Sequence, residues 1–175
     1  PTFSNMSRTR LAAIAGTLLL AASQQAYAQS EKGAEPSLDS LFFQRAEAFA
    51  EVGAWDSALA SYQKALQLNP ALDVAYQKLG SCYVKKGDYR MAIRALDKAI
   101  ELDSNDYEAY AYRGVALYKM GNFEQGERDF TTAIRINSKF ALSYYFLGSL
   151  YLAWRRYHEA VAQFDRFSRL GVPSS

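Results

Sequence analysis

Hydrophobic and polar residues follow one another along most of this chain with the spacing of helices. Leu59, Tyr62 and Leu66 lie three and four residues apart, and an equivalent apolar set follows 34 residues later. Apolar residues at this spacing trace one face of a helix. Glycines such as Gly53 and Gly87 separate one periodic stretch from the next. The pattern therefore predicts short helices joined in pairs by tight turns.

Five sets of positions recur with the same interval of 34 residues, and each set keeps one kind of side chain. The sets are Trp55, Tyr89, Phe123 and Tyr157; Phe42, Tyr76, Tyr110 and Tyr144; Ala46, Gly80, Gly114 and Gly148; Phe49, Tyr83, Leu117 and Tyr151; and Ala58, Ala92, Gly126 and Ala160. A shared period of this length is typical of repeat proteins. We expect the small residues to let two helix backbones approach. The aromatic set that begins at Trp55 is expected to hold each helix pair together.

The turns inside the repeats carry their own signals. Gly53, Gly87 and Gly121 lie between the two periodic stretches of their repeats. Glycine there adopts the left-handed conformation that ends a helix without a steric penalty. Asp88 and Asn122 follow two of these glycines, and a side-chain oxygen at that place is expected to cap the next helix.

The residues that carry the period resemble the tetratricopeptide repeat, most clearly in the second repeat. That repeat has Tyr76, Leu79, Gly80, Tyr83, Ala92 and Ala99 at the places where the family has its pattern. The expected repeats are about 39–72, 73–106, 107–140 and 141–174, and together they form a domain over 39–172. The resemblance implies an all-α fold, a right-handed superhelical solenoid of four tandem helix-turn-helix repeats.

Several residues depart from the family pattern. Arg45 and Arg113 replace the leucine before the small residue, and Gly126 replaces alanine inside a helix, at a cost of about 1 kcal/mol. Arg155 stands where the glycine between the helices is usual, and Phe167 stands where alanine is usual. The fourth repeat is therefore atypical, as terminal repeats generally are.

The amino-terminal segment has a different character. Arg8 and Arg10 precede an uncharged run over 11–22, and Ala26-Tyr27-Ala28 follows it. A basic start, a short apolar stretch and a small-x-small site describe a secretory signal peptide, and the run is shorter than the roughly 20 residues of a membrane span. We expect a signal peptide over 1–28 (with residues upstream of Met6), a flexible linker over 29–38 and a tail over 173–175. The alternative is an amphipathic helix that belongs to the domain.

Export changes the charge balance and predicts the compartment. The chain has 20 Lys and Arg against 18 Asp and Glu, and two of the basic residues but none of the acidic ones precede Ala28. The mature chain is therefore formally neutral and offers no overall attraction to nucleic acid or to anionic membranes. We expect cleavage after Ala28, a periplasmic or secreted protein, and no stable membrane insertion afterwards.

The chain shows no combination of residues that predicts catalysis. His158 is the only histidine and Cys82 the only cysteine, so a zinc site of the usual ligands or a Ser-His-Asp arrangement lacks partners. We predict no enzyme activity, no cofactor and no metal. Cys82 is expected to be a buried thiol, and the alternative is an intermolecular disulfide.

The resemblance implies a concave binding face built by the first helix of each repeat. Carrying the register across residue by residue places these residues on it: Phe43, Glu47, Val74, Gln77, Ser81, Val84, Lys85, Ala111, Val115, Tyr118, Lys119, Leu142, Tyr145 and Leu152. Some family members clamp a terminal carboxylate with Lys and Asn on this face. Phe43, Glu47, Gln77 and Ser81 replace those residues here, so that activity is not transferred.

These features predict a non-catalytic interaction scaffold or adaptor of the bacterial cell envelope that binds a segment of a partner protein. Two alternatives stay open: a self-assembling structural subunit, and an accessory subunit that regulates an enzyme in trans. The protein is expected to be a monomer or a weak homodimer, with Val161, Phe167 and Leu170 as the dimer contacts.

Overall fold

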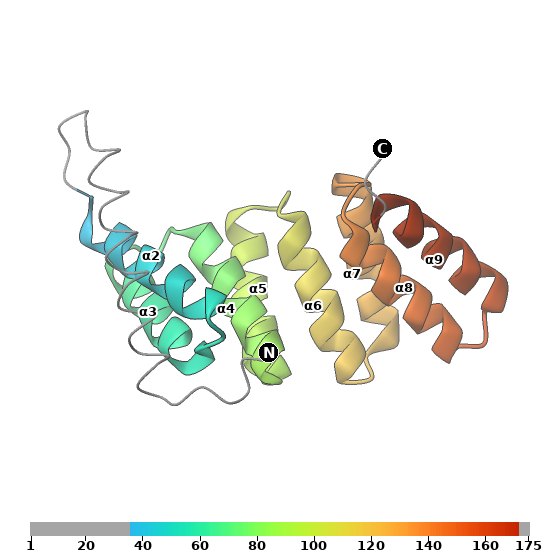
Figure 1. Ribbon diagram of the computed structural model, residues 1–175, viewed down its shortest axis with the longest axis horizontal. Coiled ribbons are helices and arrows are strands. Elements are labelled where there is room, and N and C mark those ends of the chain that lie inside the picture. The colour runs from blue at the N-terminus through green and yellow to red at the C-terminus, as the bar shows by residue number, and fades with distance from the viewer. Residues whose placement is uncertain (1–35, 172–175) are drawn as a thin grey trace. The chain divides into compact units, whose positions relative to one another are not determined.

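The computed structural model describes residues 36–171, which contain eight α-helices and no β-strand (Figure 1). The helices are α2 (Leu38–Glu51), α3 (Trp55–Leu68), α4 (Asp73–Lys86), α5 (Tyr89–Leu102), α6 (Tyr107–Lys119), α7 (Phe123–Ile136), α8 (Ala141–Ala153) and α9 (Tyr157–Gly171). The all-α prediction is confirmed. The predicted signal peptide, residues 29–35 of the linker and the tail lie outside the described residues. Within those residues, no helix has the length and apolar character needed to cross a membrane.

The chain divides into two compact units, and the boundary falls between Ala75 and Tyr76. In the first unit α2 packs against α3. The contact is built from small residues such as Ala46, Ala58 and Ala65 around Tyr62, all of them buried. Because the alanines leave room, the Tyr62 ring is buried where α3 meets α2 and lies 5.6 Å from the Phe43 ring.

In the second unit, successive helices from α5 to α9 pack against one another in chain order. Figure 1 shows α6 to α9 as neighbouring helices that alternate in direction. Their core consists of Val115, Phe130, Leu147, Leu150, Tyr151 and Ala160. Because each helix contacts mainly its neighbours, the unit has the nearest-neighbour packing of a repeat solenoid.

The small residues of the first helices receive large side chains from the second helices. A Cβ atom added to Gly114 would lie 2.7 Å from Cε1 of Phe130, and one added to Gly80 would collide with Leu96. A Cβ added to Gly126 would lie 3.3 Å from the carbonyl oxygen of Gly114. The prediction that these positions allow close approach is confirmed, and Gly126 offsets its helix cost by letting α6 and α7 meet backbone to backbone.

The turns within the repeats follow the predicted geometry in three cases. Gly53, Gly87 and Gly121 have φ angles of +71°, +86° and +82°. The predicted cap by Asp88 is confirmed, because its carboxylate accepts a hydrogen bond from the Met91 amide at 3.2 Å. The predicted cap by Asn122 is wrong, since its side chain makes no capping hydrogen bond.

The fourth turn places a non-glycine residue in the left-handed region. Arg155 has a φ angle of +59°, and its amide donates to the Leu152 carbonyl at 3.0 Å. An L-residue with a Cβ is strained there by about 1–2 kcal/mol. The turn therefore has the same backbone conformation as the other three turns, but Arg155 is strained in a position where they have an unstrained glycine.

Replacing Arg155 with glycine is expected to stabilise the protein by about 0.5–1 kcal/mol. Relief of the strain exceeds the extra entropy that glycine gains in the unfolded chain. The free energy of urea unfolding measures the effect. Gly121→Ala is the matched control and should destabilise, because an added Cβ there meets no atom within 4 Å and only strain changes. A lower unfolding free energy for Arg155→Gly would contradict this account of the turn.

The last member of the Trp55 set behaves differently from the others. Phe123 lies between Tyr118 and Trp154, with ring centroids 5.7 and 6.3 Å away, so it connects its own helix pair to the next one. Tyr157 holds the same place in α9 and is 58% exposed. The prediction that Tyr157 holds its helix pair together is wrong, because most of its side chain is exposed to solvent.

Candidate functional site

Four aromatic rings form a continuous run across α6, α8 and α9, and we call this run the aromatic array. It consists of Tyr118, Phe146, Tyr145 and Phe167. The ring centroids are 6.0 Å apart from Tyr118 to Phe146, 5.2 Å from Phe146 to Tyr145, and 5.4 Å from Tyr145 to Phe167. The two tyrosines that the sequence places on the first helices therefore belong to one surface feature.

Phe146 joins the array to the core, and it was not among the residues predicted from the sequence. Its ring stacks on the fully buried Phe130 at 6.0 Å with an angle of 9° between the planes. The place that Phe146 occupies holds Lys78 in the second repeat and Tyr112 in the third. Because no single residue type recurs there, the 34-residue period gives no signal for it.

The array presents apolar surface beside positive charge. Tyr145 is 43% exposed, whereas Tyr118 is half-buried against Phe123 and Phe146. The Lys119 ammonium lies 5.8 Å from the centre of the Tyr118 ring, a distance at which a cation and a ring attract. A partner that covers the array from Tyr145 to Tyr118 would therefore meet aromatic rings and, at the Tyr118 end, a cation.

The remaining predicted residues differ in how far a partner can reach them. Val74, Lys85, Lys119 and Leu152 are exposed, and Phe43, Glu47, Val84 and Leu142 are half-buried. In the first unit the Glu47 carboxylate accepts a hydrogen bond from the Tyr62 hydroxyl. The Phe43 ring meets Tyr62 edge-on at 5.6 Å. These two residues thus already contribute to the packing of α2 on α3.

Four predicted residues are buried and offer no side chain for direct contact: Gln77, Ser81, Ala111 and Val115. The Gln77 amide donates to Glu108, and the Ser81 hydroxyl donates to the Lys78 carbonyl at 2.9 Å. Val115 belongs to the core of the second unit. Family register alone does not distinguish such interior residues from their exposed neighbours, so a partner on this face would touch the side chains around them.

A charged cluster lies between α5, α6 and α7. Arg113 donates through Nε and Nη2 to the two carboxylate oxygens of Asp129, both at 2.8 Å, and through Nη1 to Asp97 at 2.7 Å. The cluster borders a cleft of about 370 Å³ that Ile93, Leu117, Gln125 and Arg128 also line. The Asp129 carboxylate raises the pKa of Arg113. Each guanidinium nitrogen of Arg113 already donates a hydrogen bond to a carboxylate. The cluster therefore stabilises the packing of the three helices and is not arranged to bind a ligand.

Arg113 stands out in the sequence as a departure from the family pattern, whereas its partner Asp129 was not among the residues predicted. Asp129 is 6% exposed and stands 34 residues after Ala95. The second repeat has Leu79 and Ala95 at the two places where the third has Arg113 and Asp129. A paired departure, in which one residue becomes basic and the other acidic, is the signal that identifies the contact.

Arg156 fixes the turn between α8 and α9. Its guanidinium lies 4.3 Å from the centre of the Tyr151 ring, donates to Glu159, and reaches Glu127 of α7 at 3.2 Å. Burial and the Glu127 carboxylate raise the pKa of Tyr151 to about 12. These contacts tie the last repeat to the third one.

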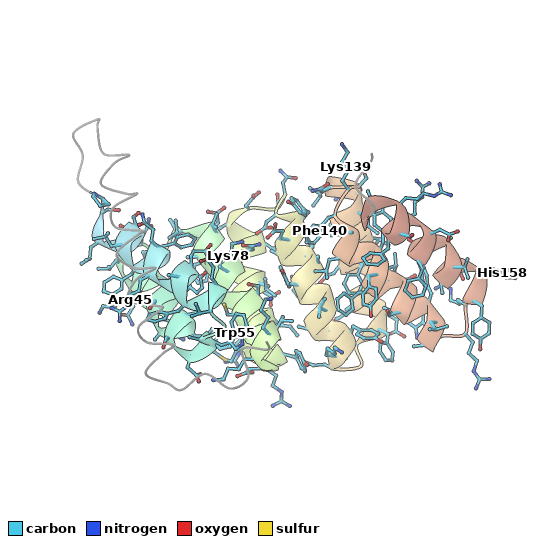
Figure 2. All side chains as sticks on the ribbon, viewed as in Figure 1. Arg45, Trp55, Lys78, Lys139, Phe140 and His158 are labelled. Carbon is cyan, nitrogen blue, oxygen red and sulfur yellow. The ribbon has the colours of Figure 1, made fainter. Side chains whose placement is uncertain are left out.

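The Cys82 thiol lies where the sequence predicts, and the single histidine lies on the surface. His158 is exposed near the start of α9 (Figure 2), and Cys82 is buried. In this conformation a second chain has no access to the Cys82 thiol. Residues 36–171 contain no group of three or more His, Cys, Asp or Glu side chains placed to hold a metal ion.

Sequence profiles of one repeat family match this stretch of helix pairs. A TPR repeat profile matches residues 46–87 and 80–121, and tetratricopeptide repeat profiles match 107–140 and 141–170. The chain belongs to the tetratricopeptide repeat family. Tetratricopeptide repeats are protein-interaction modules and generally have no catalytic role of their own. Among curated proteins, no sequence matches the chain.

Solved tetratricopeptide repeat structures share the fold at low sequence identity. MamA 41-end from Desulfovibrio magneticus RS-1 has a TM-score of 0.72 and 19% identity, with 93% of each chain covered. Another MamA crystal structure has a TM-score of 0.71 and 23% identity, with 87% of this chain and 85% of that chain covered. The Arabidopsis OM64 TPR domain has a TM-score of 0.63 and 20% identity, with 64% of this chain and 93% of that chain covered. These similarities show the fold.

Proposed function

We propose that this protein is a non-catalytic scaffold or adaptor of the bacterial cell envelope. It binds an extended or helical segment of a partner protein on the face that its first helices present. The observation that carries this proposal is the aromatic array, which joins Tyr118 and Tyr145 through Phe146. Tetratricopeptide repeats use such faces to bind proteins.

The chemistry of the array suits a protein partner. Tyrosine combines a large apolar ring with a hydroxyl that can stay hydrated, and a few such residues usually supply most of the binding energy. Lys119 and Lys85 occupy equivalent places one repeat apart and are both exposed. They would orient an acidic flank of the partner and affect the association rate and its salt dependence more than the affinity.

Replacing Tyr145 with alanine is expected to weaken binding of the partner by about 2 kcal/mol, or roughly thirtyfold, as at a hot spot. The partner would be captured from the cell envelope, identified by mass spectrometry, and titrated against the variant. Tyr118→Ala should weaken binding as well, and its melting temperature must be measured because Tyr118 also packs on Phe123 and Phe146.

The control for this experiment is Leu102→Ala, which removes an exposed apolar side chain outside the array. It should leave binding of the partner unchanged. If the folded Tyr118→Ala/Tyr145→Ala double variant binds the partner as tightly as the unaltered protein, the array is not the binding surface.

The envelope location rests on the amino-terminal sequence, and it predicts a mature protein that begins at Gln29. Arg8 and Arg10, the apolar run and the Ala26-Tyr27-Ala28 site support cleavage after Ala28. Amino-terminal sequencing of the protein from its native host checks this. Recovery from the cytoplasm with Arg8 and Arg10 still attached would contradict the location.

A further inference from the structure

Two ion pairs cross the joint between the second and third repeats, Lys78 with Glu108 and Asp97 with Arg113, and the second is the closer of the two. Asp97 lies in α5, the second helix of its repeat, and Arg113 lies in α6, the first helix of the next repeat. Their side chains are 2.7 Å apart, and α5 packs against α6. A carboxylate on a second helix and a guanidinium on the following first helix therefore form an inter-repeat ion pair.

The same two positions recur near the two ends of the described chain. Asp165 lies in α9, two 34-residue repeats after Asp97, and Arg45 lies in α2, two repeats before Arg113. Both side chains are exposed, and Figure 2 labels Arg45 on α2. Neither forms an ion pair within residues 36–171. Each end therefore carries one half of an inter-repeat ion pair.

Arg45 also lacks the second carboxylate that Arg113 has. The second helix of its own repeat has Ser61 at the place where α7 has Asp129. The Arg45 guanidinium instead lies 5.5 Å from the centre of the Phe49 ring. Arg45 is thus held over an aromatic ring with its hydrogen-bond donors available to a carboxylate from outside the repeat.

The apolar positions around Asp165 and Arg45 match in the same register. At the joint between α7 and α8, Phe123 meets Trp154, Glu127 meets Arg156, and Gly126 faces Leu150. The equivalent pairs formed by α9 and the α2–α3 hairpin are Tyr157 with Val52, Val161 with Ala54, and Ala160 with Ala48. Each of these pairs is apolar on both sides; Tyr157 and Val161 are exposed, whereas Ala160 and Ala48 are already buried.

We propose that the α9 end of one copy of this chain binds the α2 end of a second copy, with Asp165 paired to Arg45 of the next copy. The contact is heterologous, because α9 of one copy meets α2 of the next, so it can repeat from copy to copy and build longer assemblies. Leu41 stands where the following repeats have Ala75, Ala109 and Ser143, all fully buried. The larger side chain keeps the joint between copies less closely packed than the joints between repeats, so the association is weak.

The inference is separate from the proposed binding of a partner on the aromatic array, because it uses Arg45 of α2 and Asp165 of α9. Its test is a charge exchange in the full chain, followed by sedimentation velocity over a concentration series. The unaltered protein should gain mass steadily with concentration and should not stop at a dimer. Asp165→Arg alone and Arg45→Asp alone each place like charges at the joint, and each should associate at least about tenfold more weakly.

An equimolar mixture of the two variants should regain the association of the unaltered protein. In the mixture the arginine introduced in one variant meets the aspartate introduced in the other at one joint. At the next joint the native Asp165 meets the native Arg45, so both joints have opposite charges. Arg94→Asp and Glu124→Arg change the net charge equally at exposed places in inner repeats and should have no effect. A strictly monomeric protein, a mass that stops at a dimer, or variants that fail to complement each other would overturn the proposal.

Discussion

Replacing Phe130 with alanine is expected to lower the free energy of unfolding by about 3–5 kcal/mol. The Phe130 ring is fully buried, packs on the backbone of Gly114, and stacks on Phe146 at 6.0 Å. Its loss leaves a cavity between α6, α7 and α8 that neighbouring backbones are too rigid to fill. Urea unfolding followed by circular dichroism measures the change.

The chain offers a matched control for this substitution. Phe164 holds the place of Phe130 in the last repeat and packs on Gly148, but it is only half-buried. Phe164→Ala should therefore cost clearly less than Phe130→Ala. If both substitutions lowered the free energy of unfolding equally, the stacking of Phe130 on Phe146 of the fourth repeat would add nothing to the packing of Phe130 within its own repeat.

Replacing Asp129 with alanine is expected to destabilise the protein by about 3 kcal/mol, because it leaves the Arg113 guanidinium without its main partner in a mostly buried place. The Asp129 side chain is 9% exposed and that of Arg113 is 22% exposed. Asp97 should not compensate, since its own side chain is 55% exposed and hydrated. Thermal and urea unfolding measure the loss.

The double variant Arg113→Leu/Asp129→Ala distinguishes two causes of destabilisation. One is the cost of leaving the Arg113 charge buried without a partner, and the other is the loss of the ion pair itself. It copies the Leu79 and Ala95 pair of the second repeat. Replacing a buried ion pair with apolar residues of suitable size is often neutral or stabilising. The double variant should therefore regain most of the stability that Asp129→Ala loses. A double variant as unstable as the single one would show that the ion pair itself is required.

The helix pairs could be predicted from the sequence because two local signals agree. The 34-residue period fixes which residues face one another, and glycines at Gly53, Gly87 and Gly121 fix where the first helix of a repeat ends. Even the fourth turn follows this geometry, although Arg155 has no glycine-like freedom. At Arg155 the packing of α8 against α9 holds the turn in this conformation, against the conformational preference of the residue itself.

The charged cluster could not be predicted in full, because its ion pairs depend on which side chains lie close together in space, and the sequence pattern does not show this. Arg113 was visible as a departure, but each carboxylate that binds it is 16 residues away on another helix. Only the packing of α5, α6 and α7 brings the three side chains together.

The candidate binding surface was predicted in part for a similar reason. Family register identified Tyr118 and Tyr145, and the structure joins them through Phe146. The same register also selected Ala111 and Val115, which are buried. Exposure depends on the size of the residues in the adjacent repeat, and a single-repeat pattern carries no information about that.

The last helix has a consequence for how the molecule opens. Helix α9 buries one residue, Ala160, whereas α7 and α8 bury several each. In a protein whose segments open in cooperative units, the unit with the fewest buried contacts opens most often. Backbone amides of α9 would then exchange with solvent sooner than those of α7, by fluctuations that leave the inner helices intact. If a molecule bound to the outer side of α9, the first measurable effect would be slower hydrogen exchange of the α9 backbone amides.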